Sequence, residues 1–216
     1  MICRIEDLNK ISTILLTAVD ASDLSRLTDN LELKVENEIL YLSVTNGEYF
    51  VKTKLNVFED IDFHATVNAN TFLKLLTKVT TETVEFNIDK NCLVIKANGE
   101  YKIPLIYDGD KMLTLPEIGI FNVTSSFNIK SDILKSILQY NSKEINKKNI
   151  VSNPVQRLYY IDNEGAITFT SGACVNVFEL EKRVKILLSQ KVVGLFKLFE
   201  DGNVEFTLWI CLTGIA

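Results

Sequence analysis

Thiol and imidazole groups are the side chains best suited to metal binding or covalent catalysis, and here they are few and far apart. The cysteines are Cys3, Cys92, Cys174 and Cys211, and His64 is the only histidine. Zinc needs clustered ligands, and nucleophilic catalysis needs a base beside the nucleophile, so this spacing supports neither. The sequence also contains no glycine-rich phosphate-binding motif. We therefore expect no enzyme, no metal and no cofactor, and we expect His64 to be a structural histidine in a strand.

Lysine side chains are the second group with a chemical use, because ammonium groups attract phosphates without reading bases. The net charge is −5, yet the segments with helical periodicity carry lysines away from their apolar stripe. Lys74 and Lys78, for example, are spaced by one helical turn. On charge alone two interpretations stay open: a surface that tracks DNA phosphates, or ordinary solvated helix faces.

Four segments show the apolar i, i+3, i+4 spacing of amphipathic helices. Asn68, Ser131 and Ser189 are candidate N-caps for the second, third and fourth of these segments, because their side chains can accept from the first-turn amides. The predicted apolar stripes of the first two helices are Leu8, Ile11, Leu15 and Ala18, and Phe72, Leu75, Leu76 and Val79.

Alternating polar and apolar residues at 31–35 and 51–57 predict half-buried strands. The Asn-Gly pairs at 46–47 and 98–99 are typical of tight hairpin turns, because both residues tolerate positive φ. The predicted fold class is therefore α+β, with antiparallel sheet and two helices packed on one face in each repeat.

The sequence repeats itself at an offset of roughly 120 to 125 residues, which suits one domain per copy. A turn-rich stretch at about residues 107 to 124 predicts a linker. We expect domain 1 to span 1–123 and domain 2 to span 124–216. The matched segments are 7–11 with 132–136, 43–47 with 168–172, 72–76 with 195–199, and 83–88 with 203–208.

Several stretches of the first copy resemble the β sliding clamp of bacterial replicative DNA polymerases, the DNA polymerase III beta subunit. The resemblance implies the DNA-clamp fold, in which helices line the central hole of a ring and duplex DNA passes through. The stretches that carry it are Leu31-Glu32-Leu33-Lys34-Val35, Leu42-Ser43-Val44-Thr45-Asn46-Gly47, 66–72, Leu93-Val94-Ile95 and Tyr101-Lys102-Ile103-Pro104-Leu105.

The family resemblance implies a processivity factor that binds duplex DNA without sequence specificity through lysine-bearing helices. The sequence has no apolar run of about 18 residues and begins with acidic residues where a signal peptide needs a basic start, so we expect a cytoplasmic location. Its implied partners are duplex DNA, a DNA polymerase and clamp-loader subunits, with no membrane. The alternative is a clamp-like interaction protein or fragment, from a phage or mobile element, that binds replication proteins without encircling DNA. The candidate DNA-binding residues are Lys10, Arg26, Lys74, Lys78, Lys135, Lys147, Lys191 and Lys197, and the candidate partner-binding residues are Thr170 and Val175.

The chain departs from the family in length, since bacterial clamps have three such domains and this sequence has room for two. Few residues follow 203–208, so we expect the second domain to be incomplete and to lack a closing hairpin. Family rings total six domains, and a symmetric ring repeats one interface until it closes. We expect a homo-oligomer only if the ring can close, and otherwise weak self-association or none.

Overall fold

The computed structural model describes residues 1–19, 27–45, 50–57, 61–115, 123–141, 158–162, 167–170, 174–177, 185–189 and 203–209. The chain forms two compact units, Met1–Ile118 (unit 1) and Gly119–Ala216 (unit 2). The division falls inside the stretch predicted to be a linker. In the described part of the chain, no helix is long and apolar enough to span a membrane.

Unit 1 consists of two half-motifs that follow the same order: a strand, a helix and three further strands. A small two-stranded ribbon, β9 (Tyr107–Asp108) and β10 (Lys111–Met112), follows them. The first half-motif contains β1 (Ile2–Arg4), α1 (Ile5–Ala18), β2 (Asn30–Glu36), β3 (Ile39–Thr45) and β4 (Phe50–Asn56). The second contains β5 (His64–Asn68), α2 (Ala69–Leu76), β6 (Thr83–Asp89), β7 (Cys92–Lys96) and β8 (Glu100–Pro104).

The two half-motifs exchange their first strands. One antiparallel sheet has the order β4-β3-β2-β5, and the other has the order β8-β7-β6-β1. Thus β5 pairs with β2, placing Leu33 opposite Ala65, while β1 pairs with β6, placing Cys3 opposite Val84. Each sheet is therefore complete only when both halves of the unit are folded.

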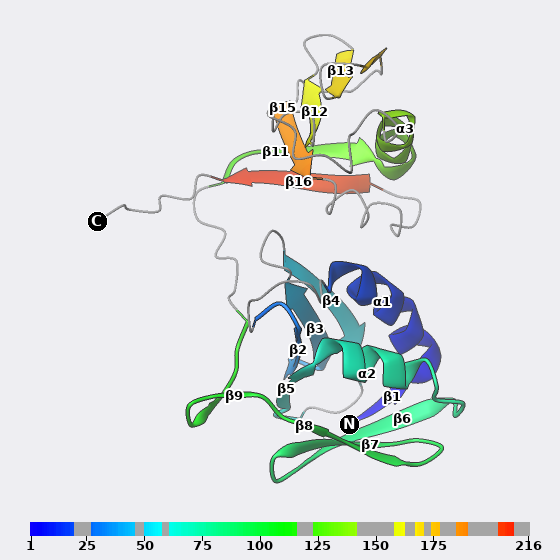
Figure 1. Ribbon diagram of the computed structural model, residues 1–216, viewed down its shortest axis with the longest axis vertical. Helices are drawn as coiled ribbons and strands as arrows, with labels where there is room; N and C mark the ends of the chain where they lie inside the picture. Colours follow the sequence, from blue (N-terminus) through cyan, green and yellow to red (C-terminus); the bar gives the residue numbers. More distant parts are fainter. Residues whose placement is uncertain are drawn as a thin grey trace, which may run out of the picture. The chain divides into compact units, whose positions relative to one another are not determined.

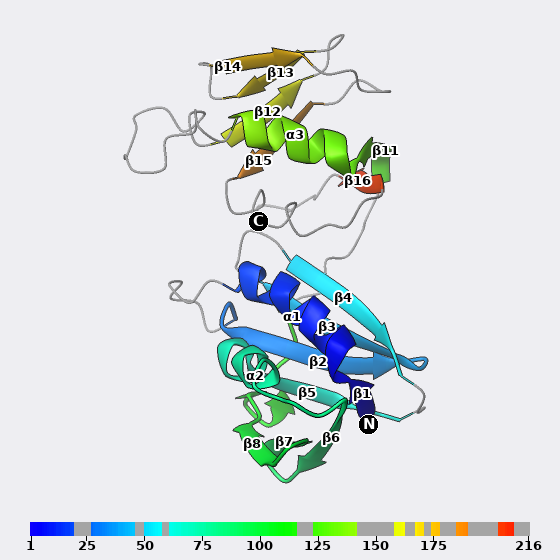
Figure 2. The same ribbon diagram turned by 90° about the vertical axis from the view of Figure 1, so that its right-hand side faces the viewer.

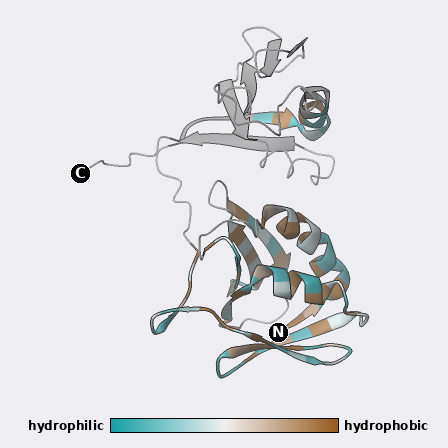
Figure 3. Cartoon of the chain, viewed as in Figure 1, coloured by the Kyte–Doolittle hydropathy of each residue, from teal (hydrophilic) through white to brown (hydrophobic). Residues whose placement is uncertain are grey.

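Helices α1 and α2 pack side by side over the sheets, as Figures 1 and 2 show. Leu8 and Leu15 of α1 and Phe72 of α2 are fully buried in this layer. The centroid of the Phe72 ring lies 5.8 Å from that of the Phe86 ring on β6. Helix α2 therefore packs against the sheet that contains β6, although the strand before it, β5, belongs to the other sheet. In Figure 3 the hydrophobic positions alternate with hydrophilic ones along the strands, as a half-buried sheet requires.

Local signals explain where several elements begin and turn. The Asn68 Oδ1 atom accepts hydrogen bonds from the Thr71 N–H (3.0 Å) and the Thr71 hydroxyl (2.9 Å), which confirms the predicted N-cap of α2. The predicted turn at 98–99 joins β7 to β8, where the Ala97 N–H donates to the Gly99 carbonyl. Asn37 and Glu38, both at positive φ, form the turn between β2 and β3. The predicted turn at 46–47 lies outside the described residues.

Unit 2 repeats the strand order of unit 1 over its described residues. It contains one strand pair, β11-β16, and one sheet of order β14-β13-β12-β15. Strand β11 precedes helix α3 as β1 precedes α1, and β15 pairs with β12 as β5 pairs with β2. The elements are β11 (Val123–Lys130), α3 (Ser131–Asn141), β12 (Leu158–Asp162), β13 (Ile167–Thr170), β14 (Cys174–Val177), β15 (Lys185–Ser189) and β16 (Asn203–Trp209).

The α+β fold class with antiparallel sheets is confirmed, and some details differ from the sequence analysis. The first half-motif opens with a strand that was not predicted, the three-residue β1, which is too short to show periodicity. Helix α2 ends at Leu76, so Val79 belongs to the following turn, where its N–H donates to the Leu76 carbonyl at 3.1 Å. The fourth predicted helix, after Ser189, lies outside the described residues.

The N-cap of α2 yields a stability prediction. Asn68→Ala removes the acceptor of two hydrogen bonds, so we expect unit 1 to lose about 1 kcal/mol of stability, the usual cost of losing such a cap. Asn56→Ala is the matched control, since Asn56 is exposed at the end of β4 and should change stability by less than about 0.5 kcal/mol. Urea titration followed by the amide NMR signals of unit 1 measures both, and equal effects would contradict the capping role.

Candidate nucleic-acid interface

Helix α2 carries Lys74 in its last turn, and Lys78 lies two residues beyond the end of the helix. The predicted placement of Lys78 on the helix itself is therefore wrong: the C-cap is Thr77, and the Lys78 N–H donates to the Leu75 carbonyl at 2.9 Å in the closing turn. Both side chains remain exposed on the same end of α2. A cation in the last turn of a helix also stabilises the helix dipole, which gives Lys74 a structural role besides any binding role.

The ammonium groups of Lys74 and Lys78 have no carboxylate within ion-pair distance in the part of the chain that the structure describes. Residues 69–79 contain no acidic residue, so helix α2 and its closing turn bear positive charge only. Among the predicted site residues that the structure describes, these two lysines are therefore the ones whose charge is most available to an anion.

Helix α1 presents a different electrostatic surface. The Lys10 Nζ atom lies 3.1 Å from Glu6 Oε1 one turn earlier, and both side chains are exposed. Such a pair contributes little stability, but it offsets the charge that Lys10 could offer to a phosphate. Although α1 and α2 pack side by side, the cationic character is concentrated on α2.

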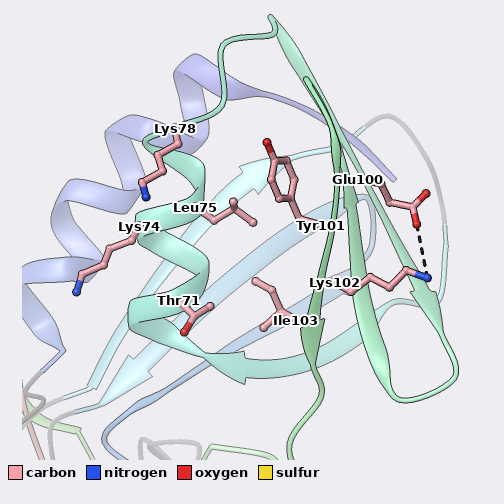
Figure 4. Close-up of a pocket in the computed structure, with 8 residues that line it drawn as sticks. All are labelled: Thr71, Lys74, Leu75, Lys78, Glu100, Tyr101, Lys102 and Ile103. Atoms are coloured by element: carbon pink, nitrogen blue, oxygen red, sulfur yellow. Dashed lines mark ion pairs between the residues drawn. The ribbon is translucent and has the colours of Figure 1, made fainter.

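A shallow groove runs between α2 and strand β8 (Figure 4). Leu75 from the helix and Tyr101 and Ile103 from the strand point toward one another in the groove, with Thr71 at its lower end. Glu100 and Lys102 lie on the other side of β8, where their charged groups pair at 3.5 Å. Apolar side chains thus meet in the middle of the groove. Lys74 and Lys78 also line it, with their ammonium groups directed away from β8.

Of the five remaining predicted DNA-binding residues, the structure describes Lys135 alone. Lys135 lies on α3 of unit 2 and is half-buried, with an interaction of its own. The other four lie outside the described residues, and they are Arg26, Lys147, Lys191 and Lys197.

The two predicted partner-binding residues lie on neighbouring strands of unit 2. In the register of β13 and β14, Thr170 pairs with Cys174, and Val175 pairs with Phe169. Thr170 and Val175 therefore lie on neighbouring strands and are not paired with each other. Their role in partner binding stays a prediction.

No cluster of His, Cys, Asp or Glu that could hold a metal is found among the described residues. His64 lies in a strand as predicted, with its Nε2 atom 2.8 Å from Glu32 Oε1. The apolar groove was not predicted, because Tyr101 and Leu75 have the pattern of ordinary strand and helix residues and only the fold brings them together.

The chain resembles known proteins in its structure but not in its sequence. No family model matches the sequence, and no curated protein matches it significantly. Among solved structures, the chain is similar to a DnaN sliding clamp (DNA polymerase III subunit beta) from Pseudomonas aeruginosa, bound to griselimycin. That likeness has a TM-score of 0.80 at 16% identity and covers 96% of this chain and 59% of the clamp.

Two further clamps show the same likeness. The Helicobacter pylori beta clamp bound to a DNA ligase peptide has a TM-score of 0.75 at 18% identity, covering 96% of this chain and 61% of that one. The DNA polymerase III beta subunit from Thermotoga maritima has a TM-score of 0.77 at 15% identity, with coverage of 96% and 58%. The chain therefore has the sliding-clamp fold and spans about three fifths of the length of these clamps.

Proposed function

We propose that this chain is a sliding-clamp-like processivity factor that binds duplex DNA without sequence specificity. The observation that carries the proposal is the clamp fold itself, which extends over 96% of the chain and includes both repeated units. Such a protein holds DNA through its backbone phosphates, so it needs exposed cations on a fixed scaffold and no catalytic groups.

The surface of α2 fits that requirement better than any other predicted site that the structure describes. Lys74 and Lys78 are fixed by a helix whose start is capped and whose inner face is buried. Phosphate contacts from such side chains give attraction that depends on salt but not on base sequence, which permits movement along the duplex. Lys10 should attract phosphates less strongly, because the neighbouring Glu6 carboxylate offsets its positive charge.

The proposed partners are a replicative DNA polymerase, clamp-loader subunits and other proteins of replication. One structural neighbour is bound to a DNA ligase peptide and another to griselimycin. We extend peptide binding to this chain as part of the proposal, together with the absence of catalysis and a cytoplasmic location.

A second candidate is a clamp-like interaction protein that binds replication proteins without encircling DNA. The acidic net charge and the Glu6–Lys10 pair on α1 favour it, because both weaken attraction to phosphates. The two functions differ in their response to charge reversal on α2.

The DNA-binding proposal predicts the behaviour of a double variant, Lys74→Glu with Lys78→Glu. Replacing two attractions to phosphate by two repulsions should weaken binding to a duplex about 10-fold or more at moderate salt. It should also reduce the slope of log K against log salt by roughly 0.9 for each phosphate that a lysine no longer neutralises. Fluorescence anisotropy with a labelled duplex at several salt concentrations measures both quantities.

The matched control is Lys96→Glu with Lys111→Glu, which changes the net charge equally on exposed strand positions of the same unit. We expect this control to change the affinity by less than about 3-fold, through the long-range field alone. Equal weakening in both double variants, or duplex binding that does not depend on salt, would favour the interaction-protein alternative.

Self-association follows from the edges of the two sheets in unit 1. Among the described strands, the outermost are β4 and β5 in one sheet and β1 and β8 in the other. Strand β4 carries exposed Lys52 and Lys54, and β8 ends at Pro104, which has no N–H. The Thr66 carbonyl of β5 already accepts from the Ile106 N–H. Charges and proline disfavour pairing at a sheet edge. We expect sedimentation velocity at low micromolar concentration to give mainly monomer, and a compact closed trimer would contradict this prediction.

A further inference from the structure

The groove between α2 and β8 (Figure 4) is a feature of unit 1 that duplex binding does not use. Three apolar side chains meet in it, Leu75 from the helix and Tyr101 and Ile103 from the strand. Tyr101 continues a cross-strand row whose other members, Phe86 and Ile95, are fully buried, yet Tyr101 itself is only half-buried. The apolar face of the second sheet is therefore partly uncovered at its outer strand.

The first half-motif has no such opening among its described residues. There, α1 packs against β4, which is the outer strand of its own half-motif, as well as against β3. Helix α1 has 14 residues and α2 has eight, so α2 covers less of the apolar surface below it. The groove beside β8 is thus a particular feature of the second half-motif and not a necessary result of the repeated topology.

Strand β8 also presents backbone hydrogen-bonding groups at this edge, because it is outermost in its sheet among the described strands. The Leu105 N–H donates to the Asn91 carbonyl at one end of the β7–β8 ladder, and the Ala97 N–H donates to the Gly99 carbonyl at the other. Hydrogen-bonded and non-hydrogen-bonded pairs alternate along an antiparallel ladder. The register therefore directs the backbone N–H and carbonyl of Lys102 away from β7.

An extended segment beside β8 can use these groups. The same alternation directs the backbone of Glu100 outward, whereas Pro104 has no N–H and so limits pairing to the first part of the strand. Side chains on one face of the added segment would lie beside Tyr101 and Ile103 in the groove. In this mode of recognition, main-chain bonds supply affinity and the pockets for alternate side chains supply specificity.

The charge around the groove favours an acidic segment. Lys74 and Lys78 line it on the helix side, where α2 and its closing turn contain no acidic residue. On the strand side, the Lys102 ammonium lies 3.5 Å from Glu100 and 3.8 Å from Asp89, so the charges there are paired. Among the described residues that line the groove, the unpaired charge is therefore positive, which attracts acidic segments and repels basic ones.

A second copy of this chain fits the groove less well than an acidic segment. Pairing of β8 with β8 of another copy would bring the two α2 helices, each with its two exposed lysines, toward one another. Like charges placed together at an interface oppose association.

We propose that the groove between α2 and β8 binds an extended acidic segment of a partner protein, which adds a strand to β8. Its alternate apolar side chains contact Leu75, Tyr101 and Ile103, and its acidic residues are attracted by Lys74 and Lys78. This inference rests on the peptide-binding part of the proposed function and names the surface and the chemistry of the segment. It does not depend on duplex binding, so the two proposals can fail separately.

Two synthetic eight-residue peptides test the proposal with the full-length chain. Both have valine at alternate positions, and the other positions are glutamate in one peptide and lysine in the other. We expect the glutamate peptide to bind at least about 10-fold more tightly. In NMR titrations, the amide signals of Thr71, Leu75, Glu100 and Lys102 should shift most. Equal affinity for the two peptides, no binding of the glutamate peptide, or shifts confined to other parts of the chain would overturn the proposal.

Lys102→Pro tests the addition of a strand. Proline removes the outward N–H of Lys102 but no hydrogen bond to β7, so an edge strand tolerates it, and the glutamate peptide should bind about 10-fold more weakly. Lys102→Ala is the matched control, because it removes the same charge and keeps the N–H, and it should change the affinity by less than about 3-fold. If both variants bind the peptide equally well, no strand is added to β8.

Tyr101→Ala tests the groove independently of the strand edge. It removes the largest apolar side chain of the groove, so we expect the glutamate peptide to bind about 10-fold more weakly. The amide signals of β3, such as those of Leu42 and Val44, report whether unit 1 keeps its fold in each variant. Unchanged peptide affinity in a folded Tyr101→Ala chain would show that the peptide does not occupy the groove.

Duplex binding and sedimentation separate this proposal from the other possibilities. Tyr101→Ala and Lys102→Pro should keep the duplex affinity of the unmodified chain within about 3-fold, because Lys74 and Lys78 remain. A chain that binds the glutamate peptide but no duplex contradicts the DNA-binding proposal alone. A dimer in sedimentation velocity that Lys102→Pro abolishes would place a second copy at β8, and the inference of an acidic partner segment would be wrong.

Discussion

The hydrogen bonds that β1 and β5 make to the opposite half-motif are the constraint on which the rest of unit 1 depends. Two sheets could form from two independent half-motifs, but here β1 pairs in the sheet of the second half-motif and β5 pairs in the sheet of the first. The helix that follows each of these strands must then cross back toward its own half. This crossing brings α1 and α2 side by side, and it fixes the burial of Phe72 against Phe86. The exposed faces of both helices are consequently held on one layer.

Within that layer, the charge that each helix presents depends on which acidic and basic residues lie next to one another, and not on the net charge of the chain. The net charge of the chain is negative, yet α2 carries no acid, while α1 carries Glu6 within one turn of Lys10. An exposed ion pair adds little stability, but it changes what the helix offers to a phosphate. The net charge of the chain therefore does not predict the local charge of α1 and α2, which depends on the positions of Glu6, Lys74 and Lys78.

Much of this architecture could be predicted from the sequence because it depends on local signals. The apolar stripe of α1 follows from the helical spacing of its residues, and the Asn68 cap and the turn at 98–99 each follow from one or two residues acting on nearby backbone. The repeat between the units was visible because the stretches at 83–88 and 203–208 match as sequence, and they form the equivalent strands β6 and β16. The half-motif repeat inside unit 1 was not visible, since β1 has three residues and shares topology, not sequence, with β5. The groove of Leu75 and Tyr101 and the bond from Leu115 to Glu32 join residues far apart in the chain, and only the fold reveals them.

The polar residues on the outer face of the β2–β5 sheet show how such distant contacts change the meaning of a sequence pattern. Along β2, Glu32 alternates with leucines as a solvated residue would, and Thr66 alternates with valine and alanine along β5. Both are nevertheless buried, because the backbone of the segment after β8, at Leu113 and Leu115, forms hydrogen bonds with their side chains. An alternating pattern therefore identifies the helix-covered face of this sheet correctly, but it does not show that the other face is solvated. That second face needs polar residues since it must satisfy backbone groups of an irregular segment, whereas the first needs apolar residues to pack against helices.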